Sequence, residues 1–176
     1  MVEVRTAHTA DLDAATLRAA RTLLYQVFDD MTEQDWEHCL GGTHALAWDD
    51  HQLVGHGSVV ERRLWCGGHA LRTGYVEGVV VRPDRQRQGI GGALLEALEQ
   101  IVRAGYDLGA LGASDMGAKF YQRRGWQLWQ GPTYTVSPTG VRRTEDEDGC
   151  VHVLPVTVAL NPEGSLACDW RDGDVW

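Results

Sequence analysis

The N-terminal part of the chain shows a strand pattern followed by two helix patterns. Val2 to Ala7 alternates apolar and polar residues, which predicts a strand. Thr9-Ala10-Asp11 is typical of a helix start, because short polar side chains accept hydrogen bonds from free amides. A second, short helix is predicted from the capping-box spacing that begins at Thr32, and it should end at Gly41-Gly42. The apolar residues expected to share one face of the first helix are Leu17, Leu24, Val27 and Phe28.

The middle of the chain is predicted to form a meander of antiparallel strands. Its segments alternate or run apolar between the turn-forming pairs Asp49-Asp50 and Gly67-Gly68. The predicted strands are Thr43 to Trp48, Gln52 to Arg62, Leu64 to Trp65 and His69 to Val81.

The period becomes helical over Gly89 to Ala104, which predicts a long amphipathic helix. A buried strand is then expected over Tyr106 to Leu111 and a further helix over Asp115 to Arg124, before a strand-like region, Gln127 to Leu160, around an acidic turn. The tail contains Trp170 and Trp176. We expect both to dock, because exposing each would forgo about 1.5–3 kcal/mol of burial.

Length and charge narrow the possible functions. A chain of 176 residues fits a single domain over residues 1–176. The net charge of -9 would repel nucleic acid and anionic lipid and attract a polycationic ligand, so we expect neither nucleic acid nor a membrane as a partner. No membrane-span or signal-peptide pattern is present, which predicts a cytoplasmic protein. The four cysteines and seven histidines show no metal-ligand spacing, so no metal is expected.

The strongest local motif is a glycine-rich turn between the predicted strand that ends at Val81 and the long helix. Its form is Gln86-x-x-Gly89-x-Gly91. Free amides and the positive dipole end at a helix N-terminus can bind a pyrophosphate, and glycine lets the backbone approach closely. The turn lacks the Gly-Lys-Ser/Thr of a P-loop and the third glycine of a dinucleotide fingerprint. Taken alone, it is equally compatible with an ordinary strand-to-helix turn.

A second motif, Ala118-Lys119-Phe120-Tyr121 followed by Arg124-Gly125-Trp126, lies about thirty residues further on. Both motifs, in this order, resemble the GNAT superfamily of acyl-CoA-dependent N-acyltransferases. The similarity extends along most of the chain to the aminoglycoside 2'-N-acetyltransferases. It is carried by Thr32-Glu33-Gln34-Asp35-Trp36-Glu37-His38, Gly41-Gly42-x-His44-Ala45-Leu46, Gly74-Tyr75-Val76-Glu77-Gly78 and the ending Cys168 to Trp176.

The resemblance implies an α/β (α+β) GNAT fold, in which helices flank a mixed, mostly antiparallel central sheet. It also implies acetyl-CoA as acetyl donor, CoA as product, and a homodimer. Direct transfer is expected, with Glu77 as base and Tyr121 as acid. The segments that would bind the donor are the strand residues Val79, Val80 and Val81 and the turn residues Gln86, Arg87, Gln88, Gly89, Ile90, Gly91 and Gly92.

The same resemblance implies a carboxylate-rich pocket for an aminoglycoside. Its expected residues are Asp30, Asp35, Glu77, Gly78, Gly112, Glu147, Asp148, Asp174 and Trp176 with its terminal carboxylate. Glu147 and Gly112 depart from the aspartate and serine common in the family, which bears on the substrate spectrum. Two alternatives stay open: a GNAT enzyme for another amine (a kasugamycin-like antibiotic, a polyamine or a protein N-terminus), and an acyl-CoA sensor without turnover.

Overall fold

The computed structural model describes the backbone of residues 1–176 and the side chains of all of them except Asp115 and Met116. It divides into two compact units: Met1–Val60 with Val76–Ile101, and Glu61–Tyr75 with Val102–Trp176. Strands β3 (Gln52–Cys66) and β4 (His69–Val81) and helix α3 (Ile90–Gly105) each belong to both units. The chain therefore passes between the units within regular elements. A single domain over residues 1–176 stays a prediction.

The first unit is built on strands β1 (Val2–His8), β2 (Thr43–Asp49), β3 and β4. Strand β2 pairs antiparallel with β1 on one side and with β3 on the other. Strand β4 lies beside β3. Directly after β4, the Arg82 N–H donates to the Val54 carbonyl of β3 at 2.8 Å. The long strands arise where β-branched and apolar residues alternate with small ones.

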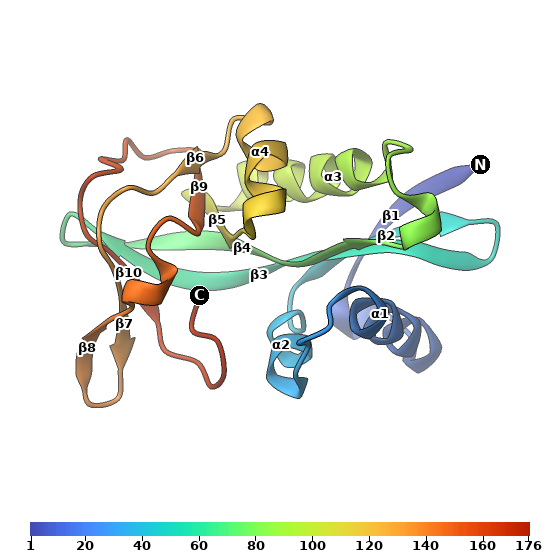
Figure 1. The fold of residues 1–176 in the computed structure, drawn as a ribbon, viewed down its shortest axis with the longest axis horizontal. Coiled ribbons are helices and arrows are strands. Elements are labelled where there is room, and N and C mark those ends of the chain that lie inside the picture. Colours follow the sequence, from blue (N-terminus) through green and yellow to red (C-terminus); the bar gives the residue numbers. More distant parts are fainter. The chain divides into compact units, whose positions relative to one another are not determined.

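Helices cover both faces of this sheet (Figure 1). A Cβ on Gly55 or Gly57 of β3 would lie 2.8 or 2.9 Å from leucines of α3, so these glycines allow α3 to pack closely. Helices α1 (Ala14–Val27) and α2 (Glu33–His38) lie on the opposite face, where Leu24 and Cys39 flank Gly78. Because side chains alternate along a strand, His56 points to the α1 and α2 side.

The second unit contains the remaining strands together with parts of β3 and β4. The order of the paired strands is β6-β9-β5-β4-β3-β10-β7-β8. Strands β4 and β5 pair in parallel, as do β7 and β10, whereas β3–β10, β5–β9, β6–β9 and β7–β8 pair antiparallel. The strand bounds are β5 Leu108–Gly112, β6 Gln127–Leu128, β7 Thr133–Ser137, β8 Gly140–Arg143, β9 Val151–Pro155 and β10 Leu166–Asp169. Helix α4 (Asp115–Arg123) packs near β6.

The mixed α/β class, the long helix and the meander are confirmed, whereas several local predictions were wrong. Thr9–Asp11 forms a 3-10 turn, and Asp13 caps α1 instead, because its carboxylate accepts from the Thr16 N–H at 2.7 Å. Phe28 lies beyond α1 and is exposed. The predicted break between Arg62 and Leu64 is absent, since β3 is continuous. The tail contains strand β10, which the pattern did not predict, and it buries Trp176 but not Trp170.

Candidate functional site

Gly78 interrupts the regular geometry of β4 between Glu77 and Val79. Its φ is 57°, a conformation that side-chain-bearing residues rarely adopt. A Cβ there would also lie 2.8 Å from the sulfur of Cys39, so only glycine fits. Glu77 is partly exposed on the neighbouring position. Strand β4 therefore presents a carboxylate next to a backbone irregularity, and such irregularities occur often beside active sites.

The turn after β4 ends in an open helix N-terminus. Arg87 and Gly89 have φ values of 59° and 84°, and nothing lies within 4 Å of the position that a Gly89 Cβ would occupy. The Gly89 carbonyl accepts from the Ala93 N–H at 3.0 Å, which begins the helical ladder of α3. The first amides of a helix have no partner inside the helix. The turn therefore has the exposed backbone and the space that a pyrophosphate needs.

Two of the three arginines near this turn are already engaged in ion pairs. Arg82 contacts Asp84, and Arg85 contacts Asp49. For Arg87, which is exposed, no ion pair occurs with any described side chain. The glutamine side chains stabilise the turn itself, since Gln86 donates to the Val81 carbonyl at 3.1 Å and Gln88 to the Asp84 carbonyl at 3.3 Å. Arg87 is thus the arginine best able to meet a phosphate.

In the second unit, Tyr121 on α4 is held among aromatic rings. Its ring centroid lies 6.2 Å from that of Trp126 and 6.4 Å from that of His152. Burial raises the pKa of the Tyr121 phenol to about 12. The phenol is therefore protonated at neutral pH, which is the state that a proton donor requires.

Glu147 and Asp174 form an acidic pair in the same unit. The pKa of Glu147 is raised by its burial first, and then by the charges of Asp174 and Asp146. Glu147 lies in a 3-10 turn (Glu145–Glu147), and Asp174 accepts from the Trp176 N–H at 3.1 Å. Carboxylates that repel each other in partial burial are a favourable place for a cation.

The neighbouring Asp148 has a different role from Glu147. Its carboxylate pairs with the Arg143 guanidinium, which, with hydrogen bonds from Thr133, lowers its pKa to about 2. Thr133 donates to it through both its N–H, at 3.2 Å, and its hydroxyl, at 3.0 Å. Asp148 therefore anchors the acidic turn to β7 and β8.

We expect Glu147→Gln to raise the melting temperature at neutral pH. The pKa of Glu147 is higher in the folded than in the unfolded chain, so protonation of Glu147 stabilises the fold. This stabilisation is complete below the ordinary pKa of 4.5 and is lost as pH rises through the folded-state pKa. Above both values, the native protein bears the repulsion that glutamine removes. The difference from wild type should vanish below about pH 4. Thermal unfolding at the two pH values tests this, with the exposed Glu163→Gln as control; an unchanged melting temperature at pH 7 would contradict it.

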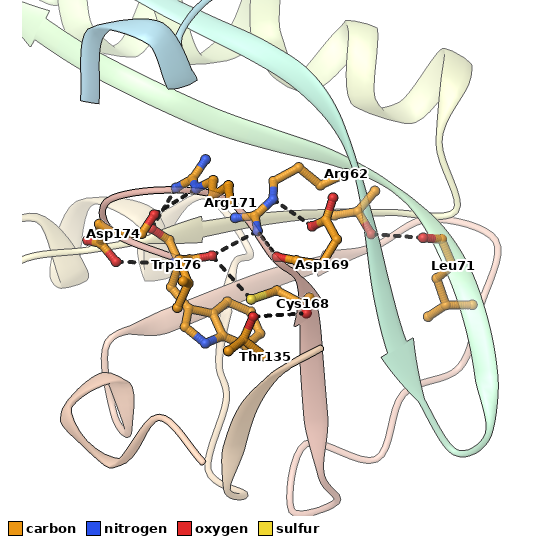
Figure 2. A network of polar contacts seen from close by, with 10 residues as sticks. Arg62, Leu71, Thr135, Cys168, Asp169, Arg171, Asp174 and Trp176 are labelled. Carbon is orange, nitrogen blue, oxygen red and sulfur yellow. Dashed lines mark hydrogen bonds and ion pairs between the residues drawn. The ribbon is translucent and has the colours of Figure 1, made fainter. Parts of the chain in front are cut away.

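The tail is held by a network around two arginines (Figure 2). Arg62 of β3, which is only 4% exposed, donates to the Asp169 carboxylate at 2.9 Å and to the Val175 carbonyl at 2.8 Å. Arg171 donates to the main-chain oxygen of Trp176 at 2.8 Å, and the Trp176 indole donates to the Thr144 hydroxyl at 3.0 Å. This network links the tail to the acidic turn that contains Glu147.

The other residues predicted for the pocket are divided between the two units. In the first unit, Asp30 is exposed between α1 and α2, and Asp35 completes the capping box by accepting from the Thr32 N–H at 2.8 Å. In the second unit, Gly112 ends β5, and a Cβ there would meet the Tyr75 hydroxyl at an ordinary 3.8 Å. The structure brings Glu147, Asp174 and Trp176 together. Arg62 was not predicted from the sequence, where its signal is a charged residue at an inward position of a strand.

The described residues offer few other kinds of site. Among the side chains that the structure describes, no group of three or more His, Cys, Asp or Glu residues could hold a metal ion. No described helix has the length and apolar character needed to cross a membrane. The four cysteines, whose side chains the structure describes, form no disulfide bond.

Comparison of the sequence with known proteins shows the family. A model of the acetyltransferase (GNAT) domain matches residues 3–129. The chain belongs to the GNAT acetyltransferase family. It is also 46% identical, over 98% of its own length and 91% of the relative, to an aminoglycoside 2'-N-acetyltransferase of Mycolicibacterium fortuitum.

Solved acyltransferase structures share the fold at low sequence identity. A GNAT family acetyltransferase from Brucella melitensis, solved in complex with acetyl-CoA, has a TM-score of 0.62 and 22% identity, covering 98% of this chain and 97% of the other. An acyl-CoA N-acyltransferase from Pseudomonas aeruginosa has a TM-score of 0.64 and 20% identity, with 88% and 99% covered. These neighbours confirm the GNAT fold that the sequence motifs predicted.

Proposed function

We propose that this GNAT protein transfers the acetyl group of acetyl-CoA to the 2'-amino group of aminoglycoside antibiotics and so confers resistance. The observation that carries the proposal is its 46% identity to the Mycolicibacterium fortuitum enzyme over 98% of the chain. The family model ends at residue 129, so this similarity alone includes the acidic turn and the tail. Those two segments contain Glu147 and Asp174, the acidic pair suited to a polycation.

Acetyl-CoA would be held by the backbone of β4 and the turn that follows. Main-chain groups of Val79, Val80 and Val81 are suited to the amides of the pantetheine arm, and the amides from Gly89 to Gly92 to the pyrophosphate. The exposed Arg87 adds a positive charge beside them. Bound acetyl-CoA supplies an activated thioester carbonyl, and the chain supplies its binding and orientation.

Two side chains would move the protons. Glu77 accepts a proton from the attacking amine, through water, because an ammonium group has no lone pair with which to attack. Tyr121 donates a proton to the departing sulfur, and its raised pKa keeps that proton on the phenol until then. The Val79 N–H donates a hydrogen bond to the thioester oxygen as that oxygen gains negative charge.

The aminoglycoside would be recognised through its ammonium groups. In the second unit, Glu147 and Asp174 would bind them directly. The roles expected for Asp30, Asp35, Gly78, Gly112 and Trp176 stay predictions. Asp148 contributes by fixing the turn, because Arg143 and Thr133 already occupy its carboxylate.

The purified protein should release free CoA thiol from acetyl-CoA when an aminoglycoside with a 2'-amine is added. A matched aminoglycoside with a hydroxyl at that position should give background release only. Polyamines, N-terminal peptides and kasugamycin serve as competing acceptors. Faster release with one of these acceptors would replace the proposed substrate, and CoA binding without release for every acceptor would favour the sensor alternative.

We expect Glu147→Gln to raise the KM for the aminoglycoside about 10- to 100-fold, the equivalent of a charge-assisted hydrogen bond of about 1.5–3 kcal/mol. The KM for acetyl-CoA should change little. The defect should shrink as salt is added, because screening weakens the wild-type contact. Steady-state kinetics at low and high salt measure this, with Glu163→Gln as control; a wild-type KM at low salt would remove Glu147 from the pocket.

Two broader properties stay predictions. We propose a cytoplasmic location, where acetyl-CoA is available, and a homodimer. Light scattering on the purified protein tests the second, and a monomer at assay concentrations would contradict it.

A further inference from the structure

A chain of hydrogen bonds runs through the interior of the first unit. It begins at the Gly78 carbonyl, which lies 2.9 Å from Nδ1 of His56. Nε2 of His56 lies 2.9 Å from Nδ1 of His44, and Nε2 of His44 lies 2.8 Å from the Thr9 hydroxyl. Both imidazoles have no exposed surface. The mechanism proposed above uses neither of them. A buried polar network of this kind is costly unless each of its groups has a hydrogen-bond partner.

The chemistry of the groups fixes the direction of every bond. A carbonyl only accepts, so His56 Nδ1 must carry a hydrogen and donate it to Gly78. The other nitrogen of a neutral His56 then accepts, which requires His44 to donate from Nδ1. The second nitrogen of a neutral His44 accepts in turn from the Thr9 hydroxyl at 2.8 Å, in preference to the Gly42 carbonyl 3.1 Å from that hydroxyl. The Gly42 carbonyl still accepts from the Thr9 N–H at 2.9 Å. The Thr9 oxygen accepts the Gly41 N–H at 2.9 Å, so the chain ends on a backbone donor.

Burial supports this assignment, because it lowers the pKa of both imidazoles to about 4. The hydrogen bond to the Gly78 carbonyl raises the pKa of His56, but burial is the larger effect. Charge on His44 lowers the pKa of His56, and charge on His8 lowers that of His44. Both rings are therefore neutral at physiological pH. Each has one donor and one acceptor nitrogen, and each tautomer is set by its neighbours.

The Gly78 carbonyl shares a peptide plane with the Val79 N–H. A trans peptide is planar and points its C=O and N–H in opposite directions. The structure contains no cis peptide bond over its described backbone, so this relation holds between Gly78 and Val79. When His56 holds the carbonyl toward the α1 and α2 side, the N–H is held toward the other side. The positive φ of Gly78 sets the orientation of this peptide group, and the hydrogen bond from His56 keeps the group in that orientation.

We propose that His44 and His56 are positioning residues that fix the Gly78–Val79 peptide group, so that the Val79 N–H is aimed in advance at the thioester oxygen. The proposal rests on the role given above to the Val79 N–H. Neither histidine touches a substrate. Thr9 at the far end holds the pair in one arrangement, which ties strand β4 to the loop after β1.

The comparison of His56→Leu with His56→Asn tests the proposal. Leucine removes the donor to Gly78, whereas the asparagine amide places an N–H where Nδ1 stood. We expect His56→Leu to lower kcat about 10- to 100-fold, since a displacement of about 1 Å in a reacting geometry can cost 10²-fold. The KM for acetyl-CoA should stay within about threefold, and His56→Asn should recover most of kcat. Ser58→Ala is the matched control, because Ser58 is buried on the same strand face and its hydroxyl has no partner among the described residues.

A second readout is independent of turnover. In protein labelled with ¹⁵N-valine, the Val79 amide resonance, assigned with Val79→Ile, should move in His56→Leu, return toward wild type in His56→Asn and stay in place in Ser58→Ala. If His56→Leu does not fold, Thr9→Val decides, and it should move the same resonance and lower kcat about two- to fivefold. An unmoved resonance, or full kcat in a folded His56→Leu, overturns the inference. A wild-type protein without acetyltransferase activity would instead refute the proposed function, while the resonance still tests the positioning.

Discussion

Glu77→Gln is expected to lower kcat by about 10²- to 10⁴-fold, the usual cost of losing a general base. Glutamine keeps the size of the side chain on β4 and one of its two acceptor oxygens, but it cannot accept the proton of the amine. Binding of the aminoglycoside should therefore change much less than turnover. The acidic limb of the pH profile should also disappear, since protonation of this carboxylate is what would slow the enzyme at low pH.

Steady-state kinetics across the pH range and calorimetry with the aminoglycoside measure the two effects separately. Glu61→Gln is the control, because Glu61 is also a strand glutamate and its exposed carboxylate pairs with Arg63 at 2.9 Å. A fall in kcat of less than about threefold at neutral pH would reject Glu77 as the base. An acidic limb that persists in Glu77→Gln would show that another acid–base group performs the step.

Gly89→Val should abolish measurable binding of acetyl-CoA. Two effects combine at this position. A branched side chain would fill the open space where a phosphate must meet the amides of α3, and valine strongly disfavours the observed φ of 84°. The second effect alone could disturb the turn without showing that a phosphate binds there.

Gly68→Val separates these effects. Gly68 lies in the turn between β3 and β4, has a φ of 81° and likewise has no atom within 4 Å of a Cβ position. Its substitution brings the same backbone strain away from the candidate phosphate site. Calorimetry with CoA should show binding in Gly68→Val and none in Gly89→Val. Equal affinity in the two variants, both folded by circular dichroism, would make the turn after β4 an ordinary connection.

The acidic residues show how similar sequence signals acquire different roles. Glu147 and Asp148 are adjacent in an acidic turn, and the resemblance to the aminoglycoside 2'-N-acetyltransferases implied that both bind the substrate. In the structure, Arg143 and Thr133 occupy Asp148 and lower its pKa, whereas burial and Asp174 raise the pKa of Glu147. The charge left for a cation is therefore concentrated on Glu147 and Asp174. This division depends on cross-strand neighbours, which the order of residues in the turn does not reveal.

The features that were predictable from the order of residues are those that depend on short-range interactions. Alternation predicted β2 and β4, helical spacing predicted α3, and the capping box at Thr32 marked the start of α2. The glycine-rich turn was also recognisable, because its backbone requirements lie within a few residues. Each of these signals reflects a preference that a segment has before it meets the rest of the chain.

Contacts between distant groups depend instead on how the strands pair in the folded chain. His44 and His56 lie on different strands, and they bond only because β2 and β3 pair in a register that places both inside. The inward arginine of β3, Arg62, binds Asp169 more than one hundred residues away in sequence, and β10 pairs in parallel with β7. Such contacts follow from strand register and from the face that each side chain takes. A shift of one residue would turn every one of these side chains to the other face, and composition and spacing do not fix that choice.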